Sequence, residues 1–131
     1  MTQRLPELSG RIDIIERGYE YLLAFAAQGR KSDAGSEVRG TLVGMHDALE
    51  GLEHLVTASV TVEGAAQRHD ASAFINALRD DALKTRGAIA FTLNCTTIGS
   101  QLIDNLNASI HVRALLTDLF LVDQALRQPT E

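Results

Sequence analysis

The chain has 131 residues, enough for one domain with its own core, and its 45% hydrophobic and 22% charged residues exclude a disordered chain. Its net charge of −5, with 12 basic residues, excludes a basic stripe for a phosphate backbone, so we expect no nucleic-acid partner. A single cysteine, Cys95, excludes an internal disulfide and a cysteine-rich zinc site, and predicts a cytoplasmic protein.

The first predicted element is a helix over residues 6–28. Its apolar residues alternate three and four apart, which places them on one helical stripe. They are Leu5, Leu8, Ile12, Ile15, Tyr19, Leu22 and Ala26. Pro6 suits the first turn of this helix, and Gly29 follows its last turn as a stop signal. The polar segment 29–36 reads as a loop. Its side chains that could cap the next helix are Ser32, Asp33 and Ser36.

The same spacing predicts a second helix over residues 35–62. Its stripe consists of Val38, Leu42, Met45, Leu49, Leu52 and Val56. β-Branched residues weaken the end of this helix, and we expect a turn between Gly64 and His69. A third helix is predicted over residues 70–94, with Asp70 or Ser72 as its cap.

A fourth helix is predicted over residues 100–128, after a turn or a kink at 94–100. Asparagine, threonine, glycine and serine crowd that junction and favour helix poorly. Four helices joined by short connections favour antiparallel neighbours. The sequence therefore predicts an all-α fold: one domain over residues 1–131, forming an antiparallel four-helix bundle of up-down-up-down topology that a second copy completes.

The prediction of a second copy depends on surplus apolar residues in the fourth helix. Outside its main stripe this helix carries Ile110, Leu116, Phe120 and Leu121. A helix that is apolar nearly all round is buried on more than one side. We therefore expect a homo-oligomer, a dimer in its simplest form, with these four residues in the interface. Residues 87–103 carry no charge, but they are too polar for an isolated membrane-spanning helix, so no membrane contact is expected.

One candidate metal site lies on the second helix. His46, Glu50 and His54 stand four apart, so they line one face and could offer nitrogen and oxygen ligands. That face points away from the predicted core, whereas helical bundles that bind two metal ions project their ligands inward. Solvated helix surface is therefore the competing interpretation, and we expect no cofactor.

Two partial resemblances give the same histidine other roles. His46 with His69 and Asp70 is similar to the ligand order of metal-dependent phosphohydrolases, whose later acid would be Asp118 or Asp123. An exposed histidine on a helical bundle also resembles a histidine phosphotransfer domain. Those domains place a lysine and a glycine shortly after the histidine. This chain has Glu50 there, which inverts the charge, and its glycine is displaced by one position.

A candidate small-molecule pocket groups uncharged polar residues with the first helix. Its members are Tyr19, Asn94, Cys95, Thr97 and Gln101. Polar uncharged groups inside an apolar bundle are what such a pocket needs. The competing interpretation is that these side chains bond to backbone carbonyls near a helix junction.

The leading hypothesis is a non-enzymatic helical bundle that acts by binding another protein, as an adaptor, a regulator or a small chaperone does. The surplus apolar surface and the absence of a catalytic motif favour it. The alternative is a bundle that binds a small molecule or a metal, as a metal-dependent hydrolase or a histidine phosphotransfer module.

Overall fold

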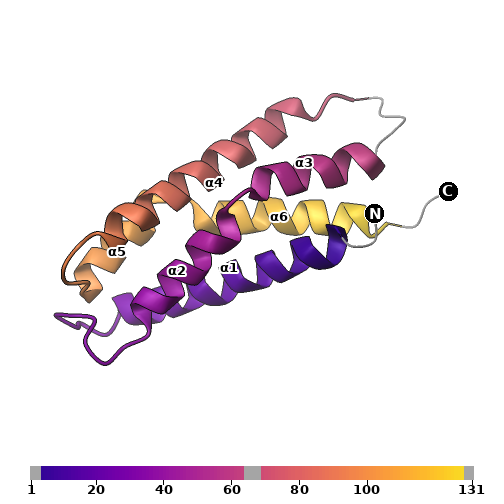
Figure 1. The fold of residues 1–131 in the computed structure, drawn as a ribbon. Coiled ribbons are helices and arrows are strands. Elements are labelled where there is room, and N and C mark those ends of the chain that lie inside the picture. Colours follow the sequence, from indigo (N-terminus) through magenta and orange to yellow (C-terminus); the bar gives the residue numbers. More distant parts are fainter. Residues whose placement is uncertain (1–3, 64–68, 129–131) are drawn as a thin grey trace.

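The protein is all-α, as the sequence predicts, and its helices pack around one shared core (Figure 1). The computed structural model describes residues 4–63 and 69–128, and these residues include no strand. The helices are α1 (Arg4–Ala26), α2 (Val38–Leu49), α3 (Leu52–Glu63), α4 (Ser72–Leu93), α5 (Ser100–Ser109) and α6 (Val112–Leu126). The predicted turn at 64–69 falls, except for His69, outside the described residues.

The helices run back and forth along one long axis. α1 leads away from the end where it begins, α2 and α3 return, α4 runs away again, and α5 and α6 return (Figure 1). α1 and α4 each contact all four of α2, α3, α5 and α6. The pair α2 and α3 and the pair α5 and α6 therefore each bridge α1 and α4.

The predicted helix over 35–62 is two helices, α2 and α3, because the chain bends at Glu50 and Gly51. Glu50 is extended, with ψ of 122°, and Gly51 has φ of 69°, a conformation that side chains with a Cβ rarely adopt. The bend exposes the carbonyl of Glu50, and Arg11 on α1 donates a hydrogen bond to it. All six residues of the predicted stripe are nevertheless buried, so the bend keeps both halves facing the core.

The predicted helix over 100–128 is also divided, into α5 and α6, at Ile110 and His111. Ile110 ends α5 in an extended conformation, with ψ of 160°. In a continuous helix Ile110 and Val112 would point about 200° apart. Because the chain is extended between them, both side chains are buried. No glycine or proline marks this bend, and the local signal is a run of residues with weak helix propensity.

The other boundaries lie close to the predicted ones. α1 begins and ends two residues before the predicted 6–28, and α4 lies within 70–94. The junction at 94–100 is a turn, since α4 ends at Leu93 and α5 begins at Ser100. In the parts of the chain that the structure describes, no helix is both long enough and apolar enough to cross a membrane.

Candidate functional site

The predicted interface residues on α5 and α6 divide into two groups. Ile110 and Leu116 are 4% and 5% exposed, so they belong to the core of this chain. Phe120 and Leu121 are 42% and 58% exposed. α6 contacts α1, α3 and α4, and a helix with three neighbours buries a wider stripe than a helix with two. The surplus apolar surface of α6 is therefore reduced to Phe120 and Leu121.

Further large apolar side chains are exposed on α4. Phe91 is 74% exposed, and Leu83, two turns earlier, is half exposed. Leu83 and Phe91 lie eight residues apart and share one face of α4. Phe120 and Leu121 are consecutive residues of α6, so their exposed side chains point about 100° apart around the helix.

The candidate pocket residues at 94–101 surround a clamp made by Arg39 of α2. Its guanidinium donates hydrogen bonds to the carbonyls of Leu93 at 3.1 Å, Cys95 at 2.7 Å and Thr96 at 2.8 Å. It also donates from Nε to Asp33 at 2.7 Å. Leu93 is the last residue of α4 and Cys95 and Thr96 follow it, so the helix itself supplies no donor for these carbonyls. Arg39 thus ends α4 and fixes the junction.

Asp33 completes this clamp from the loop between α1 and α2. Its second carboxylate oxygen accepts the backbone N–H of Ile98 at 2.9 Å. The hydrogen bond from Ile98 and that from Arg39 lower the pKa of Asp33 from 3.8 to about 2. Asp33 therefore joins two loops rather than capping α2.

A second set of hydrogen bonds joins the same two loops through Ser100, the first residue of α5. The Ser100 hydroxyl donates to the carbonyl of Phe25 at 2.6 Å and accepts the N–H of Arg30 at 2.8 Å. The N–H of Ser100 donates to the carbonyl of Arg30 at 2.9 Å. A Cβ on the preceding Gly99 would lie 2.9 Å from that carbonyl oxygen, so the loops approach each other at a glycine.

The structure does not bring the five pocket candidates together. Asn94, Thr97 and Gln101 are exposed, and Cys95 is half-buried beside the Arg39 clamp. Tyr19 lines a different cleft, with residues of α6. The geometry at 94–101 is that of a loop held by an arginine and an aspartate.

The candidate metal ligands on α2 and α3 are separated by the bend at Gly51. His54 is exposed and lies 3.5 Å from Glu53, His46 lies 3.7 Å from Asp47, and Glu50 lies 3.6 Å from Arg86 of α4. Across residues 4–63 and 69–128, no three histidine, cysteine, aspartate or glutamate side chains are grouped so that they could hold a metal ion.

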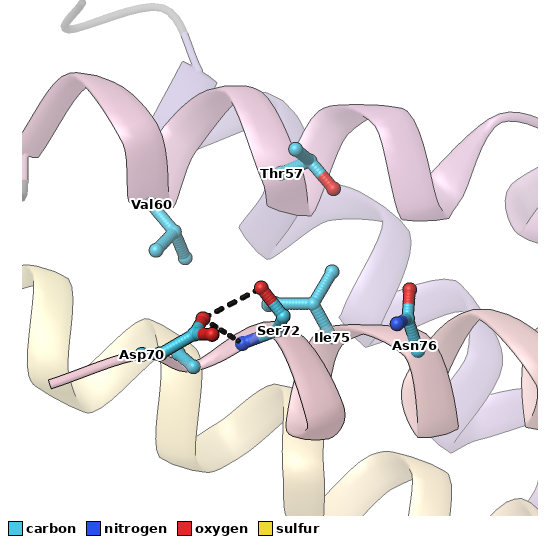
Figure 2. A pocket seen from close by; sticks show the side chains of 7 residues that line it. Thr57, Val60, Asp70, Ser72, Ile75 and Asn76 are labelled. Carbon is cyan, nitrogen blue, oxygen red and sulfur yellow. Dashed lines mark hydrogen bonds between the residues drawn. The ribbon is translucent and has the colours of Figure 1, made fainter.

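The residues of the phosphohydrolase resemblance have other partners. Asp70 accepts the N–H of Ser72 at 2.9 Å and its hydroxyl at 2.6 Å, and these bonds lower the pKa of Asp70 (Figure 2). Asp123 accepts from Arg127 at 3.0 Å. Asp70 therefore forms a local turn with Ser72 just before α4, whose N-cap residue is Ala71 and has no side-chain cap hydrogen bond.

Three of the clefts on the described surface lie between helices. One lies between α3 and α4, has a volume of about 310 Å³, and combines Val60 and Ile75 with the polar Thr57 and Asn76 (Figure 2). Another, of about 300 Å³, lies between α1 and α2 and includes Tyr21. The largest of the three, about 500 Å³, lies where α5 meets α6, beside Tyr19 of α1.

The third cleft contains residues that the sequence did not group. Tyr19 shares it with His111, Arg113 and Asp118, and His111 lies 3.7 Å from Asp81 of α4. Burial raises the pKa of Asp118, and the charge of Asp81 raises it further. The bend at Ile110 creates this arrangement, and the sequence signal for the bend is weak.

Comparison with models of protein families, with curated proteins and with solved structures found no match to this chain.

Proposed function

We propose that this protein is a non-enzymatic interaction module, an adaptor, a regulator or a small chaperone, that works as a homodimer in the cytoplasm. In this proposal the fold is an up-down-up-down four-helix bundle. Its first and third members are α1 and α4, its second member is α2 together with α3, and its fourth member is α5 together with α6. The outer face of α6 is the surface where two copies meet. The lone Cys95 supports a reducing compartment.

The observation that carries the proposal is the adjacent exposure of Phe120 and Leu121. Together they expose a phenyl ring and an isobutyl group on one helix. Aromatic side chains near the centre of an interface supply most of its binding energy. Because a stable interface buries roughly 1,200–2,000 Å² in total, neighbouring residues of α6 must form the rest of the contact.

The mass of the protein in solution tests the proposal. We expect a dimer by light scattering, and we expect Phe120→Glu to produce a monomer because it would bury a charge without a partner. Phe91→Glu is the matched control: it makes the same substitution at a more exposed phenylalanine on α4, and the dimer should remain. A monomeric wild type, or a dimer that Phe120→Glu leaves intact, contradicts the proposal.

A further inference from the structure

The cleft between α1 and α2 is lined by one charged side chain, two hydroxyl groups and apolar surface. Its volume of about 300 Å³ lies at the lower end of the range typical of small-molecule sites, roughly 300–1,000 Å³. Of the six described residues that line it, only Arg17 carries a charge. The six are Ile14, Arg17, Gly18 and Tyr21 of α1 and Thr41 and Gly44 of α2. The formal charge of this lining is therefore positive, in a chain whose net charge is −5.

Three side chains bring hydrogen-bond donors to this cleft. The Tyr21 hydroxyl accepts the backbone N–H of Glu37 at 3.1 Å, so its own proton remains available to donate. Thr41 follows Glu37 by one turn of α2 and brings a second hydroxyl. Arg17 precedes Tyr21 by one turn of α1, so the guanidinium and the phenol share one face of that helix. Because a guanidinium only donates, this set of groups favours a ligand that accepts hydrogen bonds.

Arg17 already has one acidic neighbour, which lies outside the lining. Its Nη2 lies 2.8 Å from a carboxylate oxygen of Asp13, one turn earlier on α1. Both side chains are exposed, 70% for Arg17 and 57% for Asp13, and such pairs bind each other weakly in water. A guanidinium has five N–H donors, and one carboxylate cannot accept from all of them. Asp13 is therefore a weak competitor for Arg17, and a ligand can share the guanidinium with it.

We propose that this cleft binds a small organic carboxylate, with its charged group between Arg17 and the hydroxyls of Tyr21 and Thr41. The apolar body of the ligand lies against Ile14 and over Gly44, where an added Cβ would have no atom within 4 Å. A carboxylate can accept two parallel N–H bonds from one guanidinium. Its single charge matches the single arginine, whereas a phosphate would bring a second negative charge to an acidic chain. The inference goes beyond the proposed self-association and does not depend on it.

The probe for the test is benzoate, with the uncharged benzamide, which has a similar shape, as its matched control. We expect titration of the ¹⁵N-labelled full chain with benzoate, at neutral pH and constant ionic strength, to give saturable chemical-shift changes at the amides of residues 14–21 and 41–44. Benzamide should bind about tenfold more weakly, because a charged hydrogen bond contributes on the order of the free energy that a tenfold change represents. Because the whole chain is acidic, general electrostatic attraction would not produce this preference for the anion.

Four variants test the donors. Arg17→Gln should weaken benzoate binding about tenfold. Arg127→Gln is the matched control, because Arg127 pairs with Asp123 one turn earlier in α6 in the same way, at 3.0 Å, and the affinity should stay within about twofold. Asp13→Asn removes the competitor of Arg17 and should strengthen benzoate binding about twofold to fivefold. Tyr21→Phe removes one hydroxyl donor and should weaken binding several-fold.

Two glycine variants test the space in the cleft. Gly44→Leu would place a side chain in the cleft and should abolish benzoate binding. Gly40→Leu is the matched control, because Gly40 also has open space around an added Cβ but does not line the cleft. Both substitutions should keep or raise the midpoint of thermal unfolding, since leucine favours a helix more than glycine does. The midpoint therefore separates loss of the cleft from loss of the fold.

The proposal fails if benzoate gives no saturable shifts at these residues, or if benzoate and benzamide bind equally. It also fails if Arg17→Gln leaves the affinity unchanged, if Arg127→Gln weakens binding as much as Arg17→Gln, or if Asp13→Asn weakens it. Benzoate binding that survives in a folded Gly44→Leu variant would place the ligand elsewhere and overturn the proposal as well. If Gly44→Leu does not fold, unchanged binding by Arg17→Gln still overturns it.

Discussion

Replacing Arg39 with methionine tests whether one side chain holds the junction between α4 and α5. Methionine keeps an unbranched apolar stem and removes the guanidinium. Three backbone carbonyls, those of Leu93, Cys95 and Thr96, then lose their donor. A net contribution of about 1 kcal/mol per hydrogen bond gives a loss of about 3 kcal/mol in the free energy of unfolding. The Arg39 side chain is 38% exposed, so water can replace part of each bond and the loss should not be larger.

Urea unfolding followed by far-ultraviolet circular dichroism measures this loss. Arg17→Met is the matched control, because Arg17 pairs with Asp13 one turn away on the exposed face of α1, and such pairs contribute about 0.5 kcal/mol or less. Amide hydrogen exchange should also become faster at Ile98, whose N–H Asp33 holds beside Arg39. A loss for Arg39→Met no larger than that for Arg17→Met would refute the assignment of Arg39 as the clamp.

Three further predictions concern the loops and the bends. Gly99→Ala should destabilise the protein by about 1–3 kcal/mol, because the new methyl group meets the Arg30 carbonyl oxygen. Gly87→Ala should stabilise it by about 0.5–1 kcal/mol, because the described residues leave open space around Gly87 in α4. Urea titration of both variants measures the contrast. The pKa of Asp33 is about 2, against 3.8 without its partners. The ionised carboxylate therefore stabilises the fold fully above pH 3.8, and this contribution is lost as the pH falls toward 2. The midpoint of thermal unfolding of Asp33→Asn should depend less on pH in that window than the midpoint of the wild type. Gly51→Ala should cost about 1–2 kcal/mol because φ is 69° there, and an unchanged midpoint of urea unfolding would show that the bend adapts.

The sequence predicts the core well because burial follows periodicity. The stripe from Val38 to Val56 is buried on both sides of a bend that the pattern did not predict. The spacing of apolar residues determines which face of a helix is apolar. A glycine with positive φ, such as Gly51, can change the direction of the helix axis while the apolar face still points to the core. Gly51 was visible in the sequence, but a glycine in an apolar pattern does not by itself distinguish a bend from a small-residue contact.

The sequence predicts the candidate sites less well because their contacts are distant along the chain. Asp33 and Ile98 are 65 residues apart, and the pair Arg39 and Cys95 is 56 residues apart. Local propensity identifies Asp33 as a cap, which is the local use of an aspartate in a loop. Only the packing of the loops shows that one of its partners, Ile98, comes from the junction between α4 and α5. The bend at Ile110 is similar, because it depends on burying the side chains of Ile110 and Val112 at once.

The hydrogen bonds at the loops also bear on the cleft beside Tyr19. Ser100 binds the carbonyl of Phe25, and Asn107 donates to the carbonyl of Leu22 at 3.5 Å, so α5 is attached to the last turns of α1. Tyr19 lies on α1 just before these turns, and α5 leads directly into the bend that forms the opposite wall. The two walls are therefore held in place without a ligand. A preformed site avoids the cost of ordering mobile side chains and loops on binding.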